Sequence, residues 1–176
     1  ATSYIPTYGV SQTRAAEVCD GAGDASTFNS TEGVLYTEIA ALADDLTSRK
    51  ISLNNGTFNN QVSISFTTVN ANRIRCIIYD GSSIVVDLSF TASNITLYNK
   101  IAIMYKSGDT QLWVNGVKVA TNNSAFSGLN LSNLSFNSGS SEPFYGKTKQ
   151  VLVFNEALTD SELTELTING LKEELI

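Results

Sequence analysis

Hydrophobic and polar residues alternate in short segments along most of the chain. This two-residue period is typical of β-strands that bury one face. Residues 62–66 alternate strictly, and similar segments run over 33–41, 51–53, 73–79, 84–88, 101–105, 112–114, 117–119 and 148–154. Turn-forming residues separate most of these segments. The pattern therefore predicts an all-β sandwich of antiparallel strands.

Two local motifs add detail to this pattern. Asn115-Gly116 lies between two strand-like segments and predicts a tight hairpin, because a type I′ turn needs positive φ at both central residues. Thr159 and Glu162 have the spacing of a capping box, which predicts a short helix ending near Asn169-Gly170. Residues 40–46 could form a helical turn, but Asp44-Asp45 favours a loop there.

Three segments resemble parts of one family. Residues 144–159 resemble the closing strand and helix start of laminin-G-like, concanavalin A-like jelly rolls. Residues 112–117 resemble the hairpin of that family, in which an aromatic residue and Val precede Asp or Asn and Gly. Together with residues 32–36, the resemblance covers roughly residues 30–168. It implies an antiparallel two-sheet jelly roll with a short C-terminal helix.

The resemblance also implies an organisation for the whole chain. We expect residues 1–30 to form an extended segment packed on a jelly-roll module of residues 31–176, within one domain. Residues 2–7 and 13–16 resemble a segment common in multi-module tail proteins of phages and in secreted bacterial proteins. This likeness implies that the chain is part of a larger multi-module protein, located outside the cell or on a virion surface.

The composition excludes several functions. The chain has no histidine, which excludes Ser-His-Asp and Cys-His catalysis and His-ligated metal sites. Its net charge of -6 makes nucleic acid and anionic membrane surfaces poor partners. No segment approaches the ~18 apolar residues of a membrane span, and residues 1–6 lack the basic and apolar regions of a signal peptide. We therefore expect neither nucleic-acid binding nor membrane insertion.

The chain has two cysteines, Cys19 and Cys76. They either form one disulfide with each other or are two unrelated thiols, and the sequence leaves both possibilities open. Cys76 lies within a strand-like segment, which favours a small buried apolar residue.

The resemblance does not by itself separate binding from catalysis, because this fold serves lectins, binding modules, glucanases and lyases. Laminarinase-like hydrolases of this fold carry a Glu-x-Asp-x-x-Glu strand whose carboxylates flank the glycosidic bond. This chain has no such run: Glu38 stands alone, and the adjacent Asp44 and Asp45 would point to opposite faces of a strand. The signature strands of the lyases are also absent from the sequence. These features favour binding without cleavage.

A calcium ion is an optional ligand in this interpretation, and no cofactor is required. Many members of the family place an Asp just before the closing strand, where this chain has Lys149 or Gln150, and neither supplies an anionic oxygen. Asp20 and Asp24, two residues that flank a glycine-rich loop, could wrap a hard cation instead. The alternative is a polar loop without a metal.

The candidate sugar-binding surface follows from strand alternation. Arg73, Arg75 and Tyr79 share one face of their segment, and Tyr36 and Glu38 share a face of theirs. If those strands lie in one sheet, they form a polar surface on which aromatic rings cover the apolar side of a sugar and charged groups bond its hydroxyls. The candidate residues are Tyr36, Glu38, Arg73, Arg75, Tyr79 and Trp113. The alternative is a solvated face with cross-strand ion pairs, and for Trp113 a place in the core.

The sequence thus predicts a carbohydrate-binding module that recognises a polysaccharide or surface glycan without cleaving it. Arg73 and Arg75 point to an acidic glycan. A structural or adhesion module without a sugar site is the second hypothesis, and a glycosidase or lyase is the third.

Residues 138–144, which are rich in Ser and Gly, are interpreted as a loop.

Overall fold

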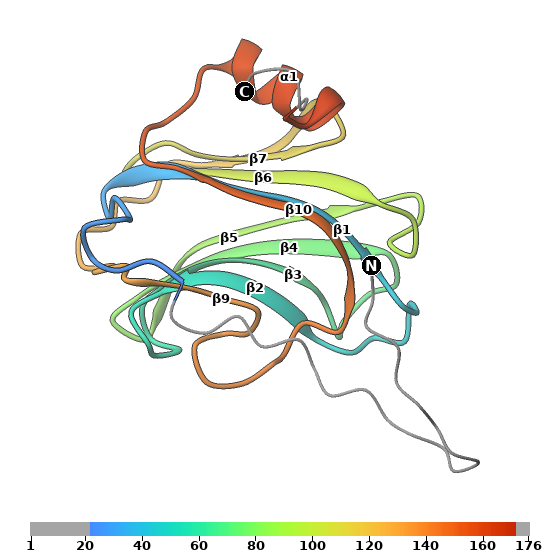
Figure 1. Cartoon of the computed structure of the whole chain (residues 1–176), viewed down its shortest axis with the longest axis horizontal. Coiled ribbons are helices and arrows are strands. Elements are labelled where there is room, and N and C mark those ends of the chain that lie inside the picture. The colour runs from blue at the N-terminus through green and yellow to red at the C-terminus, as the bar shows by residue number, and fades with distance from the viewer. Residues whose placement is uncertain (1–21, 172–176) are drawn as a thin grey trace.

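The computed structural model describes residues 22–171. Within this range two five-stranded antiparallel sheets pack face to face, and one helix lies outside them, as Figure 1 shows. The expected all-β two-sheet sandwich with a short C-terminal helix is confirmed. It follows from the alternation of the sequence, because each strand has one apolar face to bury against the opposite sheet.

The two sheets have different strand orders. One runs β10-β1-β6-β7-β8 and the other β5-β4-β3-β2-β9. The strands of the first sheet are β10 (Gly146–Phe154), β1 (Glu32–Ala41), β6 (Asn99–Lys106), β7 (Thr110–Val114) and β8 (Val117–Asn122). Those of the second sheet are β5 (Ser83–Thr91), β4 (Arg73–Asp80), β3 (Gln61–Phe66), β2 (Arg49–Asn54) and β9 (Asn133–Ser135).

The main hydrophobic core lies between the sheets. On β4, Ile74, Cys76 and Ile78 point inward and are fully buried, as the alternation predicted. Cys76 is a free thiol, and its burial among apolar side chains raises its pKa. Its interpretation as a small buried residue is confirmed. Cys19 lies outside the described residues. A disulfide between Cys19 and Cys76 therefore stays one of the two alternatives of the sequence analysis.

The predicted hairpin joins β7 and β8. Asn115 and Gly116 have φ values of 49° and 88°, and Val114 pairs with Val117 on either side of them. Positive φ at both positions is what the Asn-Gly pair predicted. Residues 40–46, for which a helical turn was the alternative, form no helix: β1 continues to Ala41, and a loop follows it as far as β2.

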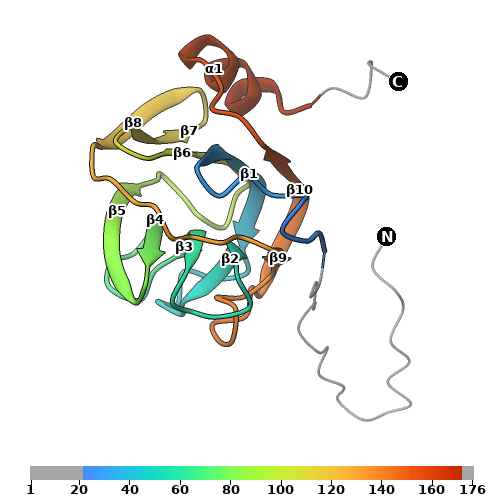
Figure 2. The ribbon, with the colours of Figure 1, turned by 90° about the vertical axis from the view of Figure 1, so that its left-hand side faces the viewer.

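Helix α1 (Asp160–Asn169) begins with the predicted capping box, in which the Thr159 side chain accepts from the Glu162 N–H. Gly170 terminates it and donates its N–H to the Leu166 carbonyl. The helix covers the outer side of the β10-β1-β6-β7-β8 sheet (Figures 1 and 2). There Leu163 and Leu166 pack in a second apolar cluster.

No helix within residues 22–171 is long and apolar enough to cross a membrane.

Candidate functional site

The outward side of the β5-β4-β3-β2-β9 sheet is polar, and we call it the polar face. Its side chains alternate along each strand with the inward residues that fill the core. Cross-strand pairing arranges them in rows. The rows are Lys50, Ser65, Arg75 and Ser89; Ser135, Ser52, Ser63, Ile77 and Asp87; and Asn133, Asn54, Gln61 and Tyr79.

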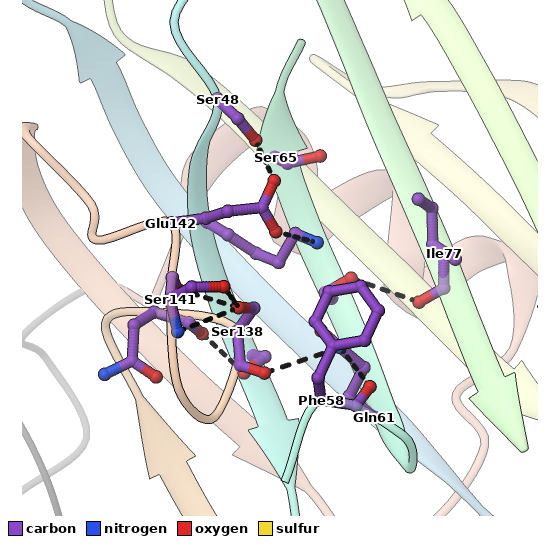
Figure 3. A network of polar contacts seen from close by, with 12 residues as sticks. Ser48, Phe58, Gln61, Ser65, Ile77, Ser138, Ser141 and Glu142 are labelled. Carbon is purple, nitrogen blue, oxygen red and sulfur yellow. Dashed lines mark hydrogen bonds and ion pairs between the residues drawn. The ribbon is translucent and has the colours of Figure 1, made fainter. Parts of the chain in front are cut away.

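Two loops, residues 55–60 and 136–145, cover the part of the polar face that lies over β2 and β3. The outward side chains of β2 and β3 beneath them are at most 3% exposed. The Ser52 hydroxyl donates to the Asn137 carbonyl at 2.6 Å, and the Gln61 amide donates to the Phe58 carbonyl at 2.6 Å. Figure 3 shows how the two loops converge over β2 and β3. The outward side chains of β2 and β3 therefore hold the two loops in place and offer no open surface to a ligand.

An ion pair fastens the second loop to the sheet. The Lys50 ammonium lies 2.8 Å from Glu142 Oε2, and the Ser48 hydroxyl donates to Glu142 Oε1 at 2.6 Å. Burial alone would raise the pKa of Glu142, but its hydrogen bonds with Lys50 and Ser48 outweigh burial and lower it. Glu142 also has a φ of 55°, the left-handed region that a residue with a Cβ adopts at a cost.

An aromatic pair lies beside this ion pair. Lys50 Nζ is 5.2 Å from the centre of the Phe58 ring, within cation–π range. The Phe58 ring in turn contacts the Tyr79 ring, with centroids 4.7 Å apart and planes tilted by 55°. Both rings are half-buried. The pair forms an apolar edge between the covered strands and the open part of the polar face.

The open part of the polar face lies over β4 and β5. Arg75 makes a two-point contact with Asp87, through Nε at 2.8 Å and Nη2 at 2.6 Å. Its hydrogen bond lowers the pKa of the Asp87 carboxyl. The neighbouring Arg73 donates to the Ser89 hydroxyl at 2.6 Å, and none of the described residues places a carboxylate within ion-pair distance of it. A depression of about 170 Å³ opens there, lined by Thr67, Val69, Arg73, Arg75 and Asp87.

These groups suit a particular kind of ligand. A guanidinium without a carboxylate partner attracts an anion, and a planar fork binds carboxylates at two points. The hydroxyl group of Thr67 can exchange hydrogen bonds with a polyol, and the side chain of Val69 can contact its apolar C–H groups. Together the groups can hold a small polar molecule that carries a carboxylate.

The predicted site residues do not all meet. Arg73 and Arg75 lie together on the open part of the polar face and line one depression, whereas Tyr79 lies on the same face at the other end of β4, against Phe58. Tyr36 and Glu38 lie instead on the other sheet, because β1 pairs with β6 and β10 and not with β4. The expectation that the two groups share one surface is therefore corrected. Strand alternation shows which residues share a face of a strand, but not which strands share a sheet.

The first-sheet candidates have structural partners. Tyr36 and Trp113 are almost fully buried in the cluster beneath α1, and the Trp113 indole donates to Gln111 Oε1 at 3.0 Å. The placement of Trp113 corresponds to the core alternative and not to an open sugar platform. Glu38 forms an ion pair with Lys149 at 2.9 Å. These three residues form no joint surface with Arg73 and Arg75.

The metal candidates are described only in part. Asp24 Oδ1 accepts hydrogen bonds from the backbone N–H and the hydroxyl of both Ser26 and Thr27, at 2.6 to 3.0 Å. These bonds lower the pKa of Asp24 and close a local turn. Asp20 lies outside the described residues. Residues 22–171 contain no group of three or more acidic or cysteine side chains that could hold a metal ion. Calcium binding at this loop stays a prediction.

Three residues of the polar face were not predicted from the sequence. Phe58 and Glu142 lie in loops without any periodic pattern, and Lys50 lies in β2, just before the segment 51–53 that the pattern identified. The loop interpretation of residues 138–144 fits the structure, but the sequence did not indicate that this loop folds over β2. The sequence around a buried ion pair between a strand lysine and a loop glutamate looks the same as the sequence around two solvent-exposed charges.

Comparisons with known proteins place this geometry in context. The family model described as the concanavalin A-like lectin/glucanases superfamily matches residues 39–164. No curated protein matches the sequence.

The solved structures that resemble the chain include modules and domains of sialidases. A carbohydrate-binding module (CBM40) of the Ruminococcus gnavus IT-sialidase, with α2,3 sialyllactose bound, is 18% identical, with a TM-score of 0.67, over 84% of this chain and 93% of that one. The leech intramolecular trans-sialidase is 20% identical, with a TM-score of 0.61, over 83% of this chain and 24% of the enzyme. The NanB sialidase of Streptococcus pneumoniae is 17% identical, with a TM-score of 0.60, over 80% and 24%. At these identities the likeness shows the fold.

Proposed function

The chain belongs to the concanavalin A-like lectin/glucanases superfamily, and from its polar face we propose that it binds an acidic carbohydrate without cleaving it. One observation carries the proposal. Two guanidinium groups lie side by side on the open part of the polar face, and within the described structure only one of them, Arg75, is neutralised by a carboxylate. Asp87 attracts Arg73 through space but forms no ion pair with it, so the Arg73 guanidinium can still bind the carboxylate of a sugar.

The surroundings of Arg73 supply the other contacts of a sugar site. Ser89 and Thr67 offer hydroxyl groups beside it, and Val69 offers an apolar side chain that lines the same depression. The similar R. gnavus module was solved with sialyllactose bound, and the sialic acid of that ligand carries a carboxylate. This likeness supports an acidic sugar as the first ligand to test.

The charges on the polar face argue against hydrolysis. A glycosidase needs one carboxyl with a raised pKa as general acid. Asp87 and Glu142, the carboxylates of the polar face, are each bonded to a cation and have lowered pKa values. Both stay ionised near neutral pH, so neither is suited to donate a proton. Binding alone is the function that these groups support.

The shallow site suggests modest affinity for one glycan. The chain's charge of -6 also opposes long-range attraction of an acidic ligand, so recognition depends on local contacts with Arg73 and Arg75. Several copies within a larger multi-module protein would gain affinity through avidity. A setting outside the cell or on a virion surface would give such a protein access to glycans.

The test is retention on a panel of acidic and neutral glycans that includes sialyllactose, with an assay for released products in the same tubes. We expect retention on an acidic glycan, no products, and loss of retention for Arg73→Ala. Lys106→Ala is the matched control, because it removes a cation from the other sheet. Retention that persists in EDTA would show that binding does not require calcium. No retention on any glycan would leave a structural or adhesion module, and released products would show catalysis.

A further inference from the structure

We infer that β10 pairs with β10 of a second copy of this chain, so that two sandwiches join through one continuous sheet. β10 is an edge strand: it bonds to β1 on one side, and no strand of residues 22–171 pairs with its other side (Figure 2). The backbone groups along such an edge are open to another strand. Two identical strands in antiparallel pairing present the same surface to each other, so a two-fold axis near the middle of β10 relates the copies.

The half of β10 that ends at Phe154 lacks the usual protection of an edge. Residues 151–154 are Val-Leu-Val-Phe, and all four side chains are partly exposed. Natural edge strands commonly carry a charge or a proline that discourages pairing. Residues 151–154 have neither, whereas Lys147 and Lys149 lie in the first half of the strand. β10 is therefore apolar at one end and basic at the other.

An apolar groove of about 470 Å³ lies between the apolar end of β10 and α1. Its apolar side chains are Phe154, Leu158, Leu166 and Leu171. Glu162 and Glu165 of α1 also line it. Glu162 is bonded to Thr159 in the capping box, but Glu165 is exposed, and the part of the chain that the structure describes places no cation within ion-pair distance of it. The apolar end of β10 thus lies beside an acidic groove.

The charges at the two ends of β10 favour a second copy as the partner. In an antiparallel pair, the Lys147 end of one strand lies beside the Phe154 end of the other. Lys147 pairs with Ala40, which alternation places on the same side of β1 as Tyr36, in the cluster beneath α1. The lysine of one copy therefore projects on the side of the joined sheet where the groove of the other copy lies.

Lys147 and Glu165 complement each other across this pair. Lys147 is exposed, and like Glu165 it has no ion-pair partner within residues 22–171. The two-fold axis repeats every contact, so the dimer contains this lysine–glutamate contact twice. The basic end discourages pairing with other strands, while the acidic groove of a second copy compensates it.

Pairing through β10 also affects the polar face. The two copies share one continuous sheet, so their second sheets lie on the same side of it. Both polar faces then point in one direction. This consequence, unlike the pairing itself, rests on the proposed function: two sugar sites on one surface increase the avidity for a glycan-covered surface.

Charge reversal tests the pairing in the full chain. Sedimentation velocity from micromolar to near-millimolar concentration should show a reversible dimer. Lys147→Glu and Glu165→Lys each place like charges at both contacts, so each should raise the dissociation constant at least ~tenfold. An equimolar mixture of the two variants should form heterodimers with about the original affinity, because both contacts are again glutamate–lysine pairs. Both side chains are exposed, so neither change disturbs the core.

Asp109→Lys is the matched control. It makes the same change of charge as Glu165→Lys, but in the turn between β6 and β7, and should leave the dissociation constant unchanged. A monomer at every concentration would overturn the inference. A dimer that neither reversal weakens would overturn it as well, because its interface would lie elsewhere. A dimer formed only by a variant that lacks residues 172–176 would show that the chain's own C-terminal residues cover the groove, again against pairing in the full chain.

Discussion

The ammonium of Lys50 lies 2.8 Å from the carboxylate of Glu142, with only 4% of the lysine side chain exposed. Lys50 projects from β2, whereas Glu142 reaches it from a loop that ends just before β10. A buried ammonium is unfavourable unless a counter-charge and hydrogen bonds compensate it. The loop therefore completes the environment of Lys50, and Lys50 holds the loop over the polar face.

Lys50→Met should destabilise the fold, because it leaves Glu142 without its cation. We expect a loss of about 2 kcal/mol in the free energy of unfolding, less than the ~3–5 kcal/mol of fully buried pairs because Glu142 is 31% exposed. Lys118→Met, in the more exposed pair with Asp160, should cost no more than about 1 kcal/mol. Equilibrium unfolding in urea measures both. Equal losses would contradict the structural role of Lys50.

The same pair predicts how stability depends on pH. The pKa of Glu142 is lowered from its ordinary 4.5 in the folded chain, so its stabilising contribution is complete above 4.5. The contribution disappears as the pH falls through the lowered value. Glu142→Gln should therefore flatten the fall in unfolding free energy below about pH 5. Urea titrations of both proteins at several pH values would measure this difference, and parallel curves would argue against it.

Gly139 tests the contact between the two covering loops. Its φ of 88° and that of Gly108, 85°, strain any other residue alike, but a Cβ on Gly108 meets nothing within 4 Å. Gly108→Ala should thus cost about 1 kcal/mol from backbone strain alone. Gly139→Ala should cost at least ~1–3 kcal/mol more, because its Cβ meets the Thr57 backbone. Similar losses in the two variants would mean that the loops are not interlocked.

The sequence predicted the fold wherever local chemistry decides the conformation. Asn115-Gly116 specified its turn through positive φ, and Thr159 with Glu162 specified the helix start. The alternation at Cys76 identified the inward face of β4. In each case the determining residues are neighbours in the chain. No long-range contact had to be known.

The site was less predictable because it depends on contacts between distant segments. Arg73 and Arg75 were found because they alternate with core residues on one strand. The separation of Tyr36 from them is a consequence of sheet topology, which alternation does not contain. Glu142 reaches β2 from a loop more than ninety residues away along the chain, a contact like that of Ser48 with the same carboxylate. Such a contact leaves no periodic signal.

Trp113, the only tryptophan, is a fluorescent probe of the β10-β1-β6-β7-β8 sheet. It is 4% exposed beneath α1, so its fluorescence should be poorly quenched by acrylamide and unchanged by a bound glycan. Leu166→Ala should increase the quenching, because Leu166 packs in the same cluster between α1 and the sheet. A change in Trp113 emission on adding a retained glycan would revive its role as a sugar platform.

The most direct measurement is a map of backbone amide shifts by NMR as sialyllactose, and then neutral lactose, is added to the protein. The shifts are expected at Arg73 and Arg75 on β4 and at Asp87 and Ser89 on β5, with the acidic sugar only. Arg73→Ala should abolish them. Shifts confined to the sheet beneath α1, or equal responses to the two sugars, would contradict recognition of an acidic glycan at Arg73.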